Sequence, residues 1–287
     1  MLRPGFLPTT AIAYLLGLAC AAHAHALRAG WPLLLAGMAV ALAAHAAANV
    51  LNDYEDHRNG ADAGNRGAIA PFTGGAGLIQ RGEATPAGTR RLALALAMAC
   101  VVAGLAIALQ STPALLGIGA LGLLVGWAYS SPPLALMSRG LGEPAIALAW
   151  TLVVVGGDTL ARGALSLLGL LLGLCYGLLV AGILLVNSFP DAAAGKASLR
   201  VRLGASAAAR LFLACQVGAH LLSALLAWRW SQPQWLLAQA SLPLGLWAGA
   251  MLWRHRHAPA ALRPAIIATI TTALLHGGLL ALVLALG

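Results

Sequence analysis

An unusual concentration of acids and amides near residue 50 has the chemistry of a cation site. Five of the eight Asp and Glu residues fall between positions 53 and 83. Three of these acids, Asp53, Asp56 and Asp62, form a cluster with two amides. The amides are Asn49 and Asn52. In chain order, the first four residues of the cluster follow helical i, i+3 or i+4, i+7 spacing and share one face, and Gly60 allows a turn that brings Asp62 back toward it.

A cation explains this grouping better than the alternative, a solvated helix end. Grouped carboxylates repel one another, and partial burial is costly unless a cation lies among them. Oxygen ligands of this kind suit Mg²⁺, Ca²⁺ or Mn²⁺ rather than zinc. Asn49 also lies one turn deeper in the apolar stretch than a solvated face requires.

A second polar cluster adds positive charge. It consists of Asn187, Asp191, Lys196, Arg200 and Arg202. Lys196 is the only lysine in the chain and its ammonium suits a phosphate, whereas the two arginines offer planar forks for bidentate contact. Two acidic sites with cations beside one of them fit a polyanion held through divalent metals, for which a diphosphate is the natural candidate. Ordinary cytoplasmic charges and a loop turn are the alternative for this cluster.

The composition indicates which solvent surrounds these clusters. The chain has 287 residues, of which 60% are hydrophobic and only 9% are charged, against about 25% charged in soluble domains. This excludes a soluble globular enzyme and predicts a lipid bilayer as partner. The net charge of +9 does not indicate a nucleic acid partner, because the composition leaves no water-facing basic surface.

Apolar windows of about 20 residues, enough to cross a hydrocarbon core, recur along the chain. They lie at residues 6–24, 32–52, 91–109, 113–130, 142–160, 164–187, 207–228, 234–253 and 264–286. They predict an all-α polytopic membrane protein, a bundle of nine transmembrane helices forming one domain over residues 1–287. The first window is expected to be a retained helix rather than a cleaved signal peptide. The two large connections, 53–90 and 188–206, are expected to be loops that cap the site, the first through its glycine-rich residues 72–77.

The cations predict the orientation. If the first window starts in the cytoplasm, the other side carries only Arg28, Arg162 and Arg229 of the 17 Lys and Arg residues. The positive-inside rule then predicts a multi-pass protein of the inner (plasma) membrane. Its N-terminus and both cap loops are expected in the cytoplasm, and its C-terminus on the opposite side.

These motifs resemble those of the UbiA superfamily of membrane prenyltransferases, most closely its MenA-like branch. The first motif of that branch, N-x-x-N-D-Y-x-D-x-x-x-G-x-D, is matched in full by residues 49–62. Segments 129–134 and 139–143 are similar to the middle signature of the family, and 187–204 to its second motif. The likeness covers residues 45–204, and nine helices agree with the family fold.

The resemblance implies an activity. An allylic prenyl diphosphate and an aromatic acceptor would bind with Mg²⁺ or Mn²⁺, and the polyprenyl group would pass to the acceptor. In the MenA-like branch the acceptor is 1,4-dihydroxy-2-naphthoate, which loses CO₂ on the way to menaquinone. The prenylation of 4-hydroxybenzoate or another aromatic compound is the alternative.

The resemblance also assigns residues to roles. The metal ligands would be Asn49, Asp53, Asp56 and Asp62 at the first site and Asn187 and Asp191 at the second. All of these except Asn187 would also be catalytic residues. The other substrate-binding candidates are Asn52, Tyr54, Arg66, Tyr129, Arg139, Lys196, Arg200 and Arg202, with Asn187 also serving in this role.

The second motif departs from the family pattern. Relatives carry another Asp four residues after the Pro-Asp step, whereas Asp191 is followed by three alanines and Gly195 arrives early. Either Asn187 and Asp191 suffice with a basic clamp, or the first motif holds the metal, or activity is altered or lost. Two rivals therefore remain, a catalytically weak binder of quinone-like lipids and a cation-coupled transporter, in which intramembrane carboxylates are common.

Polar residues inside the other windows are expected to be structural. His45, His220 and His276 should form hydrogen bonds between helices. Asp158 and Arg162, at i, i+4 spacing, should form an ion pair on the opposite side of the membrane from the two motifs.

Overall fold

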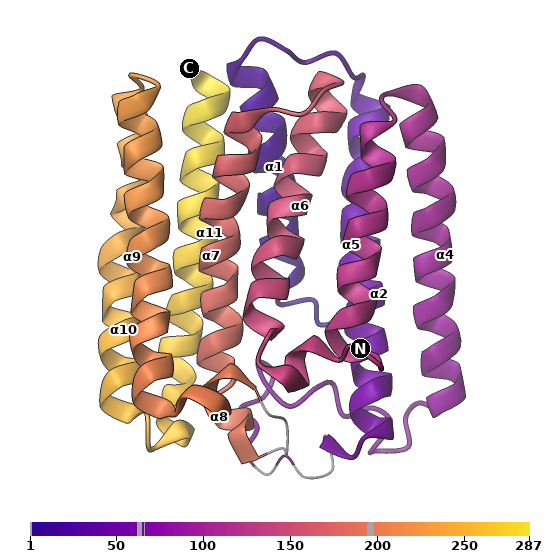
Figure 1. Cartoon of the computed structure of the whole chain (residues 1–287), viewed down its shortest axis with the longest axis vertical. Helices are drawn as coiled ribbons and strands as arrows, with labels where there is room; N and C mark the ends of the chain where they lie inside the picture. Colours follow the sequence, from indigo (N-terminus) through magenta and orange to yellow (C-terminus); the bar gives the residue numbers. More distant parts are fainter. Residues whose placement is uncertain (1, 62–64, 66, 194–197) are drawn as a thin grey trace.

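The computed structural model describes residues 2–61, 65, 67–193 and 198–287, and within them all regular secondary structure is helical. The longer helices lie along the long axis of the molecule, and the two ends of the chain lie toward opposite ends of the bundle (Figure 1). The α-helices are α1 (Leu7–His23), α2 (Trp31–Arg58), α4 (Pro86–Gln110), α5 (Ala114–Ser130), α6 (Gly142–Arg162), α7 (Leu167–Asn187), α8 (Leu199–Leu203), α9 (Ala205–Arg229), α10 (Leu242–His255) and α11 (Arg263–Leu286). The 3₁₀ helices are η1 (Leu136–Arg139), η2 (Pro190–Ala193), η3 (Pro233–Ser241) and η4 (Pro259–Leu262).

Within the described residues, 7 helical segments are long and apolar enough to cross a membrane. They are Trp31–Arg58, Pro86–Gln110, Gly142–Arg162, Leu167–Asn187, Ala205–Arg229, Pro233–His255 and Pro259–Leu286. The two other predicted windows form α1 and α5, which are apolar but only 17 residues long. Every predicted window is therefore helical, although length and composition by themselves qualify seven.

The first cap loop is shorter than the predicted range 53–90. Helix α2 continues past the apolar window to Arg58, and Gly60 with a φ of 76° follows its end. The last turn is basic, which suits the negative end of the helix dipole, and glycine adopts positive φ readily. Helix α4 starts early, at Pro86, because the Thr85 side chain caps it by accepting a hydrogen bond from Gly88 N. The first polar cluster therefore stands mostly on a helix.

The predicted window 234–253 is divided between η3 and α10. Pro243 lies in the first turn of α10. Its ring and missing N–H prevent a regular α-helix from continuing through this point, so the preceding turns wind more tightly.

Helices α1 and α6 cross so closely that glycine is required. A Cβ on Gly17 would overlap the backbone of Val154 and Asp158, and one on Gly157 would lie 2.7 Å from Tyr14 O. In a membrane, apolar burial gives little drive for helix association, so close van der Waals contact between small residues takes its place. The crossing fixes α1 within the core of the bundle.

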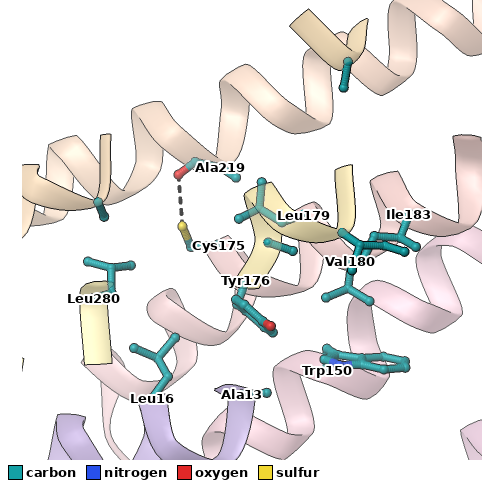
Figure 2. Packing of buried hydrophobic residues seen from close by; sticks show 14 of the residues in the cluster. Ala13, Leu16, Trp150, Cys175, Tyr176, Leu179, Val180, Ile183, Ala219 and Leu280 are labelled. Atoms are coloured by element: carbon teal, nitrogen blue, oxygen red, sulfur yellow. Dashed lines mark hydrogen bonds between the residues drawn. The ribbon is translucent and has the colours of Figure 1, made fainter. Parts of the chain in front are cut away.

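Helix α7 connects this pair to the other half of the bundle (Figure 2). The Tyr176 hydroxyl donates a hydrogen bond to Thr9 O on α1 at 3.1 Å, and the Cys175 thiol donates to Ala219 O on α9 at 2.9 Å. Both side chains are buried. Because lipid offers no competing partner, such bonds hold neighbouring helices in one register.

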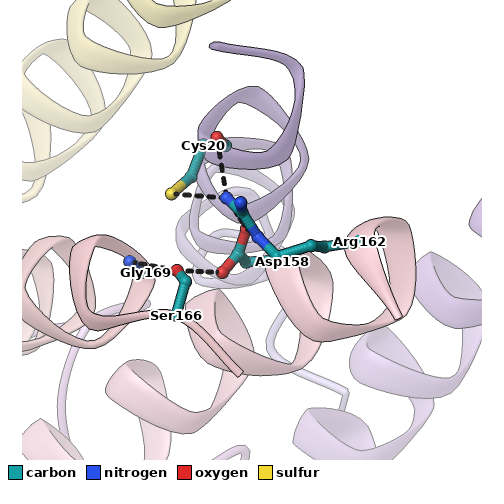
Figure 3. Close-up of polar contacts among 5 residues, drawn as sticks. All are labelled: Cys20, Asp158, Arg162, Ser166 and Gly169. Atoms are coloured by element: carbon teal, nitrogen blue, oxygen red, sulfur yellow. Dashed lines mark hydrogen bonds and ion pairs between the residues drawn. The ribbon is translucent and has the colours of Figure 1, made fainter. Parts of the chain in front are cut away.

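A charged cluster joins α1, α6 and α7 at the end of the bundle away from the two motifs (Figure 3). Arg162 Nη2 donates to Asp158 Oδ1 at 2.9 Å and to Cys20 O at 3.2 Å, and Ser166 Oγ donates to Asp158 Oδ2 at 2.5 Å. The predicted ion pair is confirmed. The cluster also explains why an acid is tolerated here with an exposed side-chain fraction of only 1%.

The three histidines inside the apolar windows behave as predicted and bond between helices. His45 Nδ1 lies 2.7 Å from Thr10 Oγ1 on α1. His220 Nε2 and His276 Nδ1 lie 2.9 and 3.2 Å from the same hydroxyl, Ser241 Oγ. These contacts join α2 to α1 and α9 to α11.

Replacing the buried acid tests the charged cluster. The substitution Asp158→Ala is expected to lower the free energy of unfolding by about 3–5 kcal/mol, because it leaves Arg162 largely buried without its partner. Thermal unfolding of the purified protein in detergent measures the change.

The matched control is Glu83→Ala in the cap loop, where Glu83 pairs with Arg81 at exposed side-chain fractions of 53% and 54%. An exposed pair contributes little to stability, because water screens the two charges. Equal effects of the two substitutions would contradict the stabilising role assigned to the cluster.

Candidate active site

The first motif occupies the last turns of α2, and the N-terminal segment contacts it directly. Asn52, Asp53 and Asp56 are buried. Arg3 Nη2 donates to Asn52 Oδ1 at 3.0 Å and to Asp53 Oδ1 at 2.7 Å. Burial by itself lowers the pKa of Arg3. The charge and the hydrogen bond of Asp53, together with the charge of Asp56, raise the pKa by more than burial lowers it, so it lies above its ordinary value. The guanidinium therefore stays charged beside these acids.

Glu55 lies on the same helical turns but has a different role. Ser131 Oγ donates to Glu55 Oε1 at 3.0 Å, and Arg58 Nη2 lies 3.2 Å from Glu55 Oε2. Both carboxylate oxygens thus have protein partners, and the bond from Ser131 fixes α2 against the end of α5. Glu55 is a structural acid within a functional motif.

The second motif begins where α7 ends and is contacted by the loop that follows the first. Asp191 Oδ1 accepts a hydrogen bond from Asn65 Nδ2 at 2.6 Å. A Cβ on Gly67 would lie 2.6 Å from Pro190 O, so only glycine allows this approach. Segments about 126 positions apart in sequence are thereby joined.

The glycine-rich segment 72–77 contacts both motifs. Asn187 Nδ2 donates to Phe72 O at 3.4 Å, and Ala76 N donates to Asp53 Oδ1 at 3.4 Å. Asp53 therefore receives hydrogen bonds from the N-terminal segment and from the cap. The two polar clusters are therefore brought together beneath this loop.

Unsatisfied buried atoms show which ligand chemistry the site fits. Asn65 Oδ1 and Asn187 Oδ1 are buried acceptors with no donor, whereas Asn49 Nδ2 and Arg200 Nε are buried donors with no acceptor. Carboxamide and carboxylate oxygens are ligands for Mg²⁺, and unpaired N–H groups suit phosphate oxygens. Among the described residues no three His, Cys, Asp or Glu side chains form a metal site by themselves. Among these residues, a metal would therefore draw on carboxamide oxygens as well as on carboxylates.

A cavity of about 340 Å³ runs from this site into the bundle. Its polar end is lined by Arg3, Asn49, Asn52, Tyr129 and Asn187, and the rest of its wall is mostly aliphatic and glycine residues of α1, α2, α4, α5, α6 and α7. The arrangement combines a polar mouth, with both charged and amide side chains, with an apolar interior. A charged head group on a long hydrocarbon chain has this combination of properties.

The sequence comparison assigns the family. The profile described as the UbiA prenyltransferase family matches residues 10–273. The chain belongs to this family. It is a prenyltransferase and an integral membrane protein. The 1,4-dihydroxy-2-naphthoate octaprenyltransferase of Mycobacterium leprae (strain TN) is 29% identical over 229 residues, covering 78% of this chain and 75% of the relative. The enzyme of the same name from Mycobacterium tuberculosis (strain ATCC 25618 / H37Rv) is 30% identical over 207 residues, covering 70% and 68%.

Solved structures share the fold. The apo structure of a UbiA homolog from Aeropyrum pernix K1 superposes with a TM-score of 0.73 at 19% identity and covers 96% of each chain. A UbiA homolog from Archaeoglobus fulgidus, bound to DMAPP and Mg²⁺, gives a TM-score of 0.64 at 15% identity and covers 98% of this chain and 97% of its own. The helical arrangement of this prenyltransferase is therefore that of its family.

Other predicted residues of this prenyltransferase lie at the edge of the site. Arg139 is exposed and donates to Pro133 O at 2.7 Å, which holds the loop after α5. The Arg200 guanidinium lies 5.3 Å from the centre of the Phe189 ring. Arg202 packs its aliphatic stem against Gly140, and Tyr54 is half-buried outside the lining of the cavity. The predicted residues Asp62, Arg66 and Lys196 lie outside the described residues.

Two residues of the site were not predicted from the sequence. Arg3 was counted only as a topological charge, and Asn65 carries no charge and stands outside the family motif. The position of Arg3 on the cytoplasmic side of the first window could have suggested its contact with the acids. No sequence signal distinguishes Asn65, because its role depends on a contact with a residue 126 positions away.

Removing the Asn65 side chain is expected to weaken the prenyltransferase. In Asn65→Ala, the charged acceptor Asp191 loses the hydrogen bond that Asn65 donates to it, which is a loss of about 1.5–3 kcal/mol. Where this loss falls fully on the transition state, it lowers kcat/KM roughly 10–100-fold. Initial rates of prenyl transfer in detergent give the value. Asn59→Ala is the control, since Asn59 Oδ1 bonds only locally, to Ala61 N. Full activity of Asn65→Ala would show that its contact with Asp191 is dispensable.

Proposed function

We propose that the protein transfers a polyprenyl group from an allylic polyprenyl diphosphate to 1,4-dihydroxy-2-naphthoate, with release of CO₂ and diphosphate. Mg²⁺, or Mn²⁺ in its place, would be required. The observation that carries the proposal is the cavity whose polar mouth lies beside two oxygen-rich motifs and whose interior is apolar. The naphthoate acceptor is supported by the names of the two mycobacterial relatives.

The donor would bind with its diphosphate at the mouth of the cavity and its tail inside. Asn65 and Asn187 offer unsatisfied oxygens to a metal, together with the carboxylates of the two motifs. Asn49 Nδ2 and Arg200 Nε offer donors to phosphate oxygens. The A. fulgidus homolog has been solved with DMAPP and Mg²⁺ and with GPP and Mg²⁺, which agrees with this mode of binding.

Ionisation of the donor is the demanding step. The bond from the allylic carbon to the ester oxygen of the diphosphate breaks, and its electron pair leaves with the diphosphate. Bound Mg²⁺ would neutralise the negative charge that develops on this leaving group. Arg3 and the cations of the second cluster, Arg200 and Arg202, would add positive charge from the protein. The cap loop from Phe72 to Ala76 would exclude water, which otherwise competes for the allyl cation.

The acceptor then supplies the new bond. The electron-rich ring carbon that carries the carboxylate attacks the allyl cation, and the carboxylate leaves as CO₂, so its electron pair restores the aromatic ring without an external base. The acceptor would lie near Tyr129, which lines the mouth of the cavity. Arg66 and Arg139 are proposed for its carboxylate, and Lys196 for the diphosphate.

The proposed orientation is nine membrane crossings with the N-terminus and both cap loops in the cytoplasm. Helices α1 and α5 have 17 residues each, about 26 Å at 1.5 Å per residue and within the range that spans a bilayer. The chain would then alternate sides and place its C-terminus opposite the site, which agrees with the positions of the two chain ends in Figure 1. Fourteen of the 17 cations fall on the cytoplasmic side, with Arg28, Arg162 and Arg229 on the other. The membrane would be the inner (plasma) membrane.

Substitution of two acids of the first motif tests which of them is needed for catalysis and which for structure. Asp53→Asn is expected to reduce prenyl transfer by at least roughly 10²-fold, because it removes a charge that the metal site needs. Glu55→Gln, its neighbour on the helix, keeps a hydrogen-bond acceptor for Ser131 and should retain most of the activity. Rates are measured with Mg²⁺ and with EDTA, using purified protein. Equal losses in the two variants would argue against a metal site at Asp53.

A panel of acceptors tests the chemistry. Mass spectrometry should show a prenylated naphthalenediol with loss of CO₂ from dihydroxynaphthoate, and little product from 4-hydroxybenzoate. Product from 4-hydroxybenzoate alone would move the protein to another acceptor class. Binding of donor without any product would favour a quinone-lipid binder, and cation-driven flux in liposomes without transfer would favour a transporter.

A further inference from the structure

We infer that the closed end of the cavity limits how much of the donor tail the protein holds, at about three to four isoprene units, and that Tyr14 is the residue that sets this limit. The inference rests on the proposed function, since it concerns the tail of the proposed donor. The evidence is the way three helices close the cavity at the end opposite the site.

Tyr14 of α1 forms the centre of this end wall. Its side chain is 3% exposed, and its hydroxyl donates to Leu34 O on α2 at 2.8 Å. A Cβ on Gly37 of α2 would overlap the Tyr14 hydroxyl and the end of the Leu160 side chain of α6. Tyr14, Gly37 and Leu160 all line the cavity, so their mutual contact closes it.

The wall has little freedom to move. The Tyr14 ring rests against Gly157, where an added Cβ would lie 3.3 Å from Cδ2, so it stands on the close crossing of α1 and α6. Leu160 and Ile107 of α4 are buried against the same ring, and the ion pair of Asp158 with Arg162 holds α6 one turn beyond. A tail that reaches Tyr14 therefore meets a rigid surface.

The depth of the cavity follows from helix geometry. Asn49 at the polar end of the cavity and Gly37 at the wall both line it on α2, and they are 12 positions apart, about 18 Å at 1.5 Å per residue. An isoprene unit advances the chain by four carbon–carbon bonds of about 1.5 Å, or roughly 5 Å when extended. Three to four units therefore fit between the diphosphate site and Tyr14.

A longer tail has one loosely packed side through which to leave. On α5, Gly119 and Gly122 line the cavity, and a Cβ added to either would meet no atom within 4 Å. Gly119 is also exposed on the surface of the protein. Units beyond the fourth would pass this face into lipid, so they should add nothing to recognition by the protein.

The test measures how recognition depends on tail length. Donors of two to eight isoprene units compete at equal concentration for one acceptor, and products are quantified by mass spectrometry as relative kcat/KM. In the wild-type protein, relative kcat/KM should rise with each isoprene unit up to about four and then level off. The tail length at which it levels off is the break. Tyr14→Ala should move the break upward by about one unit, because the removed phenol is about the size of an isoprene unit. Tyr14→Phe keeps the ring, loses only the bond to Leu34, and should leave the break in place.

A second variant tests the limit from the other side and does not depend on a deletion in the core. Ala41 lines the cavity one turn closer to the site than Gly37, so Ala41→Phe should move the break downward by about one unit. A break that is absent in the wild type, or that stays in place in both Tyr14→Ala and Ala41→Phe, overturns the inference.

Binding keeps this result separate from the proposed function. Thiolodiphosphate analogues of the same tail lengths, whose C–S bond resists ionisation, should bind without reacting. The increase in Tm that they cause should grow with each isoprene unit up to about four units and then stay constant. The tail length at which it levels off should shift in the same variants. Lack of product from every acceptor, with this binding pattern intact, would reject the proposed transfer and support the limit at Tyr14. Normal transfer with no length break would support the proposed transfer and reject the limit at Tyr14.

Discussion

A charge in the membrane-embedded part of this protein needs a partner, because lipid supplies none, and the placement of a few pairs determines how the helices assemble. Asp158 with Arg162 joins α1, α6 and α7 at one end of the bundle. At the other end Glu55 fixes α2 to α5 through Ser131, while Arg3 contacts Asp53. Asn49, Asn65, Asn187 and Arg200 at the two motifs keep buried polar atoms without a protein partner, as do a few residues elsewhere, such as Gln216. The unpaired groups at the motifs are the ones that a ligand in the cavity could reach.

The cavity depends on the same constraint. Small residues allow α1 and α6 to approach at Gly17 and Gly157, and this crossing supports the aromatic wall at Tyr14. Looser packing on the α5 side leaves space along the glycines. Close packing on one side and sparse packing on the other produce an apolar channel that begins at a charged mouth. Channel and mouth are consequences of one pattern of small and polar residues.

Much of this architecture follows from the sequence, because hydropathy and charge act locally. The apolar windows, the shared face of Asn52, Asp53 and Asp56, and the i, i+4 pair at Asp158 are properties of single helices. The end of α2 at Arg58 was misplaced, since helix capping is not visible in hydropathy. The contact of Asn65 with Asp191 was not foreseen, because it joins two loops far apart in the chain. Asn65 also brings a carboxamide to Asp191, so the second motif has one more oxygen ligand nearby than its sequence indicates.

The position of Arg3 has a practical consequence for handling the protein. Arg3 reaches Asn52 and Asp53, so the segment that precedes α1 lies against the candidate site. An affinity tag or fluorescent protein fused ahead of this segment would lie close to the polar mouth of the cavity and to the cap loop. The C-terminus leaves α11 at the opposite end of the bundle, away from the chemistry, and is the better point of attachment for purification or imaging (Figure 1).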